Sequence, residues 1–496
     1  MKSALKLKQA NLDSLSRQMD TPSYDRSQVN VGIVHVGVGG FHRSHEAYYT
    51  DKLMETGSLT WGICGVGLRE ADRKMRDVLK EQDYLYSLLV KHPDGKVENR
   101  VIGSLVDFML SVDNPQAVID RMADPETKIV SLTITEGGYN FHPVTGEFRI
   151  DNPDVQHDLA HPNEPRLIFG YLTAALQKRR RAGLPPFTVQ SCDNVPHNGD
   201  MAKRMLLAFA KAQDLALAEW IEENVCFPNA MVDRITPVTT PEDIALLESD
   251  FGVIDGWPVT CEPFCQWVIE DLFCDGRPEW EKVGAQFVAD VTPYEKMKIS
   301  LLNAGHSVLG LLGSIHGHET IDAAVRDPLF ATYLRHFMDL EATPVLDEVE
   351  GIDLDVYKDS LIERFSNPSI KDSLARICLE SSAKLPKFLL PTLRENLATG
   401  GSIAYVTLVI AAWCYYSDKG VNCHGVALDI VDEMKTELHE AAQGTAEDVL
   451  SFLGIDAIFG DLIAEEAFTS LYAQMITDLY ENPHIAVLMQ KLLNQK

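Results

Sequence analysis

The sequence predicts an α/β domain built on a mostly parallel sheet, followed by a mainly α-helical domain. Up to about residue 192, short apolar runs alternate with helical segments, which is the pattern of strand–helix units in a parallel sheet. After about residue 292 the strand signals fade and helical periodicity dominates. We therefore expect residues 1–292, with an N-terminal arm, to form the first domain and residues 293–496 to form the second.

The individual elements follow from the same periodicities. Residues 1–28 are polar and are expected to form an arm on the surface. The expected strands are 29–36, 61–66, 128–135 and 187–192, and the expected helices of the first domain are 44–55, 69–81, 115–123 and 165–182. In the second domain, helices are expected at 293–316, 320–340, 355–365, 371–380, 401–416, 426–442 and 463–479.

The composition restricts the partners of the protein. The 496 residues carry 44 basic and 73 acidic side chains, a formal net charge of −29, which opposes binding to nucleic acids and anionic membranes. The longest apolar run, 403–416, is too short to span a bilayer, and the N-terminus lacks the apolar segment of a signal peptide. The nine cysteines form no pair of C-x-x-C units, so we expect reduced thiols, a cytoplasmic location and no metal site. The expected partner is a small molecule, and we expect a monomer.

A glycine turn follows the first predicted strand. The run 29–36 continues into Gly37-Val-Gly39-Gly40-Phe41, and a helical pattern comes next. A strand, a glycine turn and a helix open a Rossmann-type domain, where the backbone approaches a pyrophosphate. The third glycine of the usual fingerprint is replaced by His42. We expect Gly37, Gly39, Gly40 and Phe41 to bind a dinucleotide cofactor.

Two acidic positions follow later strands. In Rossmann-type folds the acid that binds the adenosine ribose follows the second strand, and here Asp72 and Glu70 stand there. Arg73 and Lys74 weaken this assignment, and acids are also common at the start of a solvated helix. Glu136, followed by two glycines, ends the next strand, at the edge of an open α/β sheet where ligands bind.

One predicted helix carries the residues of an alcohol oxidation. At about 100° per residue, Lys298, His306 and Asn303 fall at roughly 0°, 80° and 140° on one side of the helix. Apolar residues surround them, so we expect Lys298 to be buried. A buried lysine can act as a general base, and an asparagine amide can donate to an alkoxide or a carbonyl oxygen.

Glu295 lies at the start of the same helix. Thr292, Pro293 and Glu295 fit a capping box, with the threonine as N-cap and the glutamate three residues later. Glu295 also lies near the side of Lys298, where it could pass protons. The two roles are compatible, and the sequence leaves both open.

Several stretches together resemble the mannitol dehydrogenase family, the polyol-specific long-chain dehydrogenases. The first is Lys298-x4-Asn303-x2-His306. The others are residues 35–43, 133–139, 191–199, 227–234, 261–264, 364–367 and 382–388. They extend from about residue 30 to beyond residue 380, and jointly they are more specific than any single motif.

The resemblance implies a Rossmann-type domain, a helical domain, a site between them, and NAD as cofactor without a metal ion. It implies that Lys298 is the general base and that Asn194 and Asn303 hold the reacting oxygen. The other implied assignments are His306, Arg376 and Lys384 at further substrate hydroxyls, Asp233 in the same pocket, Glu295 on a proton path, Glu136 near the nicotinamide and Asp72 at the adenosine ribose. Some relatives have an acid directly before Asp72, where this chain has Ala71, which leaves the discrimination against NADP open.

The implied reaction is the NAD-dependent oxidation of D-mannitol to D-fructose and its reverse. Hexuronate reduction, with fructuronate or tagaturonate as substrate, is an alternative because Arg376 and Lys384 could bind a carboxylate. Arabinitol or sorbitol oxidation is a second alternative. A non-catalytic NAD-binding sensor predicts loss of Lys298 or the asparagines, which are all present. A metal-dependent hydrolase needs clustered ligands, and the two histidines closest in the sequence are those of His316-Gly-His318.

Overall fold

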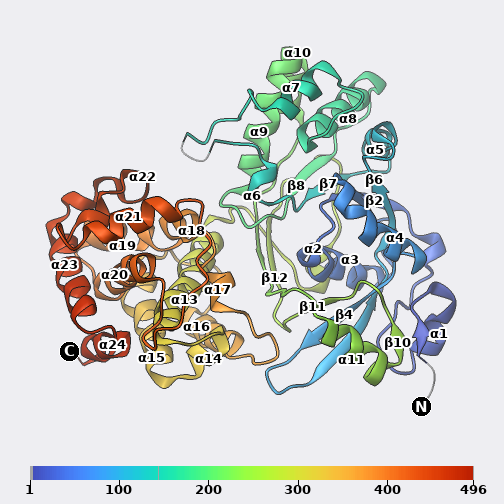
Figure 1. The fold of residues 1–496 in the computed structure, drawn as a ribbon. Helices are drawn as coiled ribbons and strands as arrows, with labels where there is room; N and C mark the ends of the chain where they lie inside the picture. The colour runs from blue at the N-terminus through green and yellow to red at the C-terminus, as the bar shows by residue number, and fades with distance from the viewer. Residues whose placement is uncertain (1–3, 143–144, 495–496) are drawn as a thin grey trace. The chain divides into compact units, whose positions relative to one another are not determined.

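The chain divides into two units near residue 291. The computed structural model describes residues 4–142 and 145–494. The first unit comprises Met1–His92 and Lys96–Val291, and the second comprises Thr292–Lys496 with Pro93–Gly95. In Figure 1 the first unit runs from blue to yellow-green and the second from yellow to red.

A five-stranded parallel sheet forms the centre of the first unit. Its strands lie in the order β6-β3-β2-β7-β8, and each neighbouring pair is parallel. Their bounds are β2 Val31–Val36, β3 Gly62–Gly67, β6 Leu105–Leu110, β7 Ile129–Leu132 and β8 Thr188–Ser191. This strand order is the Rossmann arrangement. Successive strands are added toward one edge of the sheet up to β6, and β7 is then added on the other side of β2. The predicted fold class is confirmed, and ligands are expected at the carboxyl ends of β2 and β7.

Both faces of this sheet are covered. Successive side chains of a strand point to opposite faces, so each strand contributes to the core on either side. On one face, Val34 and Val36 belong to a core with α5 Pro115–Ala123, α8 Ile168–Ala182 and α9 Asn198–Gln213. On the other face, Ile33 packs in a core that includes residues of α3 Glu46–Met54 and two buried tryptophans, Trp267 and Trp280. The two cores hold the carboxyl ends of the strands in place.

Three small sheets in the first unit were not predicted. Their strands have two to six residues and do not form the long apolar runs from which β2, β3, β7 and β8 were recognised; β6 of the central sheet was also not predicted. They are β11-β4-β5 (Val259–Cys261, Tyr86–Lys91, Val97–Ile102), β13-β12-β9 (Gln286–Val288, Gln266–Glu270, Ala230–Asp233) and β1-β10 (Leu5–Lys6, Val253–Ile254). The remaining helices of this unit are α1 Leu12–Leu15, α4 Arg73–Glu81, α7 Pro153–Ala160, α10 Leu215–Asn224 and α11 Pro241–Phe251.

Two predicted elements of the first unit differ in the structure. The helix expected at 44–55 is broken at His45, where φ is −119° and ψ is −91°, so that α2 Gly40–Ser44 and α3 follow each other. The strand expected at 128–135 ends at Leu132, and α6 Thr135–Gly138 begins soon after it. The Asp193 carboxylate accepts from the amides of Ile134 and Thr135 at 3.1 and 2.8 Å, which turns this segment away from the sheet.

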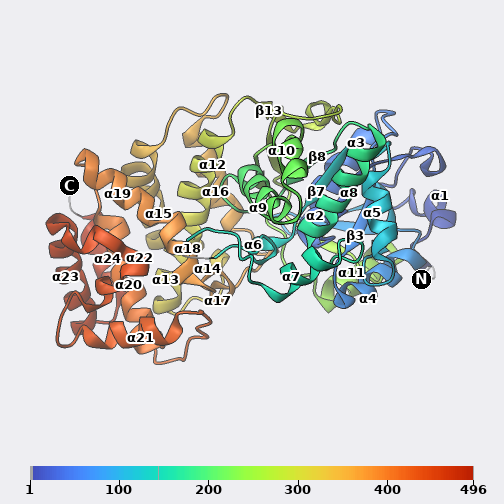
Figure 2. The ribbon, with the colours of Figure 1, turned by 90° about the horizontal axis from the view of Figure 1, so that it is seen from above.

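The regular elements of the second unit, among its described residues, are helices (Figure 2). Its longest apolar helix is α20 Ala404–Lys419, buried over most of its length. The other α-helices are α12 Thr292–Lys298, α13 Ala304–His316, α14 Ile321–Arg326, α15 Pro328–Phe337, α16 Leu354–Phe365, α17 Leu374–Ile377, α18 Ser381–Phe388, α19 Leu390–Thr399, α21 Lys435–Gly444, α22 Asp456–Phe459, α23 Glu466–Glu481 and α24 Ile485–Leu493, and π-helical turns lie at Ile299–Asn303 and Met338–Ala342. Among residues 4–142 and 145–494, no helix combines the length and the apolarity needed to cross a membrane.

Three predicted helices of the second unit differ in the structure. The helix predicted at 320–340 is interrupted at Asp327, the N-cap of α15, so that α14 and α15 follow each other. The helix predicted at 371–380 is reduced to α17, because Lys371 and Glu380 adopt positive φ values of 49° and 52°. The helix predicted at 426–442 begins only at Lys435. Residues before it form a turn closed by a bridge between Val421 and Ala427.

Candidate active site

The glycine turn after β2 has a geometry that only glycine allows at its first position. Gly37 has φ +95°, and a Cβ there would lie 2.1 Å from the carbonyl oxygen of Thr133. A Cβ at Gly39, the N-cap of α2, would have the Gly37 oxygen as its nearest heavy atom, at 3.7 Å. At Gly40 the nearest atom would be a methyl carbon of Thr236 at 3.5 Å. The protein therefore requires glycine at Gly37, whereas Gly39 and Gly40 leave their backbone open to a ligand.

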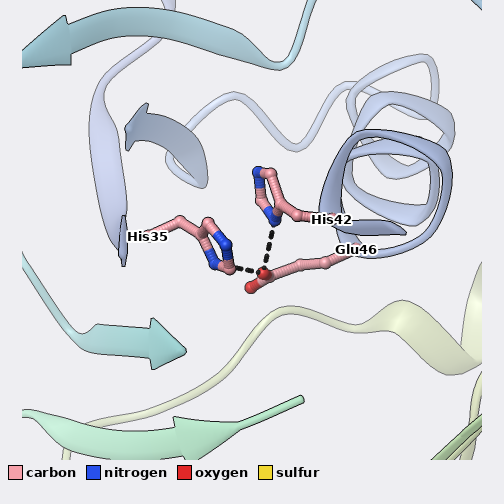
Figure 3. Close-up of side chains that lie close together, drawn as sticks. All are labelled: His35, His42 and Glu46. Carbon is pink, nitrogen blue, oxygen red and sulfur yellow. Dashed lines mark hydrogen bonds and ion pairs between the residues drawn. The ribbon is translucent and has the colours of Figure 1, made fainter. Parts of the chain in front are cut away.

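A buried cluster lies beneath this turn (Figure 3). His35 from β2 and His42 from α2 stack with ring centroids 3.4 Å apart, and both approach one oxygen of Glu46 at 3.0 and 3.1 Å. The hydroxyl of Ser131 donates to the same oxygen at 2.9 Å. The cluster joins two strands to α2 and α3 around the glycine turn.

The hydrogen bonds of this cluster connect the strands to the glycine turn. The Ser131 hydroxyl donates to Glu46, and its oxygen lies 2.8 Å from Nδ1 of His35. The Thr133 hydroxyl donates to the carbonyl of Gly37 at 2.6 Å, and its oxygen lies 2.9 Å from Nε2 of His35. The ring of His35 is therefore held by both hydroxyl groups beside the Glu46 carboxylate. These contacts fix the Gly37 carbonyl.

Burial and mutual contacts set the charges of the other two members of the cluster. Burial and the neighbouring His35 lower the pKa of His42 to about 3, so its ring is neutral at pH 7. Burial alone would raise the pKa of Glu46, but hydrogen bonds from His35 and His42 outweigh it and hold the pKa well below its usual range. The sequence reasoning missed this cluster, although the spacing His35, His42 and Glu46 around the glycines was a signal of it.

The two acids after β3 have different partners. Glu70 forms an ion pair with Arg73, which also binds Asp113 at 2.6 Å. Asp72 is half-buried, accepts from the amide of Arg69 at 3.0 Å and lies against Gly67, the last residue of β3. Glu70 and Asp113 therefore both pair with Arg73, and Asp72 is the carboxylate that lies at the end of β3.

Three further candidates lie at strand ends of the first unit. Glu136 is exposed in α6 after β7, and Asn194 is exposed after β8. Between them, Asp193 accepts from the turn that carries Glu136 and from the Tyr139 hydroxyl at 2.8 Å. Asp233 is the last residue of β9 and is only 4% exposed. Asp193 was not singled out from the sequence, because its role of joining two ligand-side turns depends on the tertiary structure.

In the second unit, Lys298, Asn303 and His306 lie on one continuous helix with a π turn. Lys298 and Asn303 are each 6% exposed, as expected from the apolar residues around them. The predicted uninterrupted α-helix is wrong here, because Ile299–Asn303 is π-helical. A π turn adds one residue, which rotates the later residues of the helix back by about 100°. Relative to Lys298, Asn303 and His306 then lie at about 40° and −20°, closer together than on a regular helix.

The other candidates of the second unit surround this helix. The ring of His306 packs on Phe365 of α16 with centroids 4.4 Å apart, and Glu295 in α12 is 7% exposed. The guanidinium of Arg376 in α17 pairs with Asp372, while the Lys384 ammonium in α18 donates to the carbonyl of Ile377 at 3.0 Å. Burial, and then the positive charge of Arg376, lower the pKa of Lys384. The two cations therefore lie within electrostatic reach of each other.

Helices α17 and α18 both pack on the helix of Lys298. At Gly310 of α13, a Cβ would lie 2.9 Å from Ile377 and 3.0 Å from Cys378, so glycine permits this close approach. Arg376 and Lys384 are thereby held on elements adjacent to the helix that carries the predicted base.

Family models match both parts of the chain. The mannitol dehydrogenase Rossmann domain matches residues 31–282, and the mannitol dehydrogenase C-terminal domain matches residues 290–481. The chain belongs to the mannitol dehydrogenase family. The resemblance inferred from the sequence motifs is thereby confirmed.

Known members of the mannitol dehydrogenase family are similar over nearly the whole chain. Mannitol 2-dehydrogenase of Phaeosphaeria nodorum is 47% identical, over 93% of this chain and 81% of that protein. A solved ternary complex of Pseudomonas fluorescens mannitol 2-dehydrogenase with NAD and D-mannitol is 47% identical, with a TM-score of 0.89 and coverage of 99% and 100% of the two chains. A substrate-free D-sorbitol dehydrogenase is 36% identical, with a TM-score of 0.90 and coverage of 98% and 100%.

Proposed function

We propose that this protein oxidises the secondary alcohol of a polyol with NAD, and that D-mannitol and D-fructose are its substrate pair. The observation that carries the proposal is the 47% identity, over 99% of the chain, to a mannitol 2-dehydrogenase solved with NAD and D-mannitol. The residues of an alcohol oxidation lie on one helix: Lys298, buried, then Asn303 and His306. This combination favours an enzyme over a binding protein that only senses NAD.

The first unit fits a dinucleotide. The open backbone at Gly39 and Gly40 permits approach of a pyrophosphate, and Phe41 follows in the same turn. Asp72 suits the adenosine ribose because it accepts at the strand end, whereas Glu70 is held by Arg73. A carboxylate at the 2′-hydroxyl repels a 2′-phosphate, so we propose a preference for NAD. Glu136, at the end of the next strand, is proposed to lie near the nicotinamide.

The reaction needs a base, oxygen donors and hydroxyl partners. When bound, NAD⁺ supplies the chemistry of hydride acceptance. Burial favours the neutral amine of Lys298, which accepts the alcohol proton. The amides of Asn194 and Asn303 donate to the oxygen as its charge grows. We propose that Glu295 passes the proton onward, in addition to any capping role.

Substrate recognition is assigned to four further side chains. We propose that His306, Asp233, Arg376 and Lys384 bind the remaining hydroxyls, since donors and acceptors are both needed along a polyol. Arg376 is already paired with the Asp372 carboxylate. A uronate carboxylate would have to compete with Asp372, so this pairing favours a neutral polyol over a hexuronate.

Sorbitol oxidation is the second candidate, because a D-sorbitol dehydrogenase has the same fold with a TM-score of 0.90. The test is kcat/KM for D-mannitol, D-sorbitol, D-arabinitol and D-mannonate with NAD⁺. D-mannitol should give the highest value. If kcat/KM for D-mannonate exceeds that for D-mannitol by about tenfold, a difference of about 1.4 kcal/mol, hexuronate reduction replaces polyol oxidation as the function. If kcat/KM is highest for D-sorbitol or D-arabinitol, the function remains polyol oxidation but the substrate changes.

Three further properties are proposed with this function. Turnover does not depend on a metal ion, because Lys298 and the two asparagines perform the task that a metal performs in other alcohol oxidations; activity should survive prolonged treatment with EDTA. The protein is a monomer and works in the cytoplasm, where NAD is available. Light scattering coupled to gel filtration tests the first of these two statements, and cell fractionation tests the second.

A further inference from the structure

A cluster of histidines lies at the far end of the catalytic helix from Lys298. Helix α13 ends at His316, and Gly317 and His318 follow it. Asp327 is the N-cap residue of α15 and accepts from the amide of Leu329 at 2.9 Å with one carboxylate oxygen. Its other oxygen lies 3.7 Å from Nε2 of His318. The end of α13 and the start of α15 thus place two imidazoles and a carboxylate together.

The polar atoms of this cluster lie close together, and two of them have no hydrogen-bond partner among the described residues. One ligand atom from each of His316, His318 and Asp327 lies within 4.8 Å of the other two. Nδ1 of His316 and Nε2 of His318 are buried, and neither has a hydrogen-bond partner among the described residues. Buried polar atoms are normally hydrogen-bonded, so two such atoms in one cluster are unusual. The Asp327 oxygen at 3.7 Å is too distant to form a hydrogen bond with Nε2 of His318.

The fold holds these rings in place from several sides. Both imidazoles pack against Phe330, with ring centroids 5.2 and 5.1 Å away. Gly317 has φ +108°, which reverses the chain so that both rings lie on the same side, and a Cβ there would lie 2.8 Å from the ring of His424. Little rearrangement is therefore needed to bring the three ligand atoms to a common centre.

We propose that His316, His318 and Asp327 bind one divalent transition-metal ion of the zinc class. Tetrahedral zinc has ligands at about 2.0–2.2 Å, so its ligand atoms are about 3.3–3.5 Å apart. The separation of 3.7 Å between His318 and Asp327 is already close to that value. Imidazole nitrogen with carboxylate oxygen suits zinc, copper or nickel, whereas magnesium and calcium prefer oxygen ligands alone. The ring of His424 or a water molecule is available for the fourth position.

The chemistry of the ligands agrees with this assignment. Neutral imidazole and carboxylate are the forms in which these side chains bind metal ions. With one carboxylate, the three ligands carry a single negative charge to match a dication.

The ion would act on stability and not on turnover. His316 lies ten residues after His306, which corresponds to about 15 Å along a helix. The site joins the end of α13 to the start of α15, so binding should stabilise the second unit against unfolding. This inference does not rest on the proposed oxidation of polyols. It also predicts that a chelator removes this ion without reducing turnover.

The experiment is titration of the metal-free full-length protein with Zn²⁺ and Co²⁺. Calorimetry measures stoichiometry, absorption measures the ligand type through the d–d bands of Co²⁺, and thermal unfolding measures stabilisation. The variants are His316→Gln, His318→Gln and Asp327→Asn. The last is the sharpest, because asparagine keeps the helix cap while removing the anionic ligand. The matched control is His161→Gln, since His161 also lies beside a second histidine, His157, at 4.7 Å.

We expect one equivalent of metal with no thiolate-to-cobalt charge-transfer band, and a rise in unfolding temperature with Zn²⁺ but not with Mg²⁺. Each of the three variants should weaken binding by at least about tenfold and abolish the thermal shift. The His161→Gln protein should behave as the parent. The proposal is overturned if ten equivalents of Zn²⁺ leave the unfolding temperature unchanged. It is equally overturned if binding survives in all three variants, or if the cobalt spectrum shows thiolate ligation.

Discussion

Replacing Gly37 by alanine tests the geometry of the glycine turn. The new Cβ would lie 2.1 Å from the Thr133 carbonyl oxygen, and φ would have to remain near +95°. The left-handed conformation costs a non-glycine residue about 1–2 kcal/mol, and overpacking costs about 1–3 kcal/mol. Together these predict a loss of roughly 2–5 kcal/mol, which lowers the unfolding temperature of the first unit by roughly 5–10 °C.

The matched variant is Gly39→Ala, two residues further on. The φ of Gly39 is −96°, and the added Cβ would lie 3.7 Å from its nearest heavy atom, the Gly37 oxygen. The free energy of unfolding should therefore change by less than about 1 kcal/mol. The added methyl group occupies space that a pyrophosphate needs, so NADH affinity should fall at least about tenfold, or 1.4 kcal/mol.

Thermal unfolding and NADH fluorescence titration separate the two effects. Gly37→Ala should lower the unfolding temperature clearly, whereas Gly39→Ala should weaken NADH binding at an unchanged unfolding temperature. If Gly39→Ala binds NADH with the affinity of the parent, the open backbone at Gly39 does not contact the cofactor. Equal stability of the two variants would refute the steric argument.

Four further predictions concern single residues. Lys298→Ala should lower kcat by about 10²–10⁴-fold while NADH still binds; near-normal turnover at pH 7 contradicts its role as base. Asn303→Ala should lower kcat by about 10²-fold, and a loss confined to NAD affinity argues against an oxyanion role. Asp72→Ala should raise the ratio of NADP to NAD use in kcat/KM; no change means that another residue sets the preference. Glu46→Gln should destabilise the first unit by about 3 kcal/mol near pH 7. Because the pKa of Glu46 is lowered in the fold, the difference in unfolding free energy between the parent and Glu46→Gln should shrink as the pH falls below about 4.5. Urea unfolding measures this difference, and a value that does not change with pH contradicts the ion pair.

Four of the five central strands and several long helices could be read from the sequence because their signals are local, whereas the central strand β6 Leu105–Leu110 was not predicted. The strand 187–192 became Thr188–Ser191, and the helix 115–123 was found at those residues. The small sheets could not be read in this way. Val259–Cys261 is a strand because it pairs with Leu88–Val90, more than 150 residues earlier in the chain, and no local periodicity reports such a pairing.

The sequence alone determined the fold class, the family and the identity of the candidate residues, since these depend on residue type and spacing along the chain. The tertiary structure decided which of these residues have partners. It showed Glu70 held by Arg73 and Arg376 held by Asp372, pairs that lie three and four residues apart in the chain. It also revealed the π turn that aligns Asn303 and His306 with Lys298, and the buried pair of His35 and Glu46 beneath the glycine turn. A buried charge is stable only with its partner, and that partner is chosen by the packing of strands and helices that are distant in the sequence.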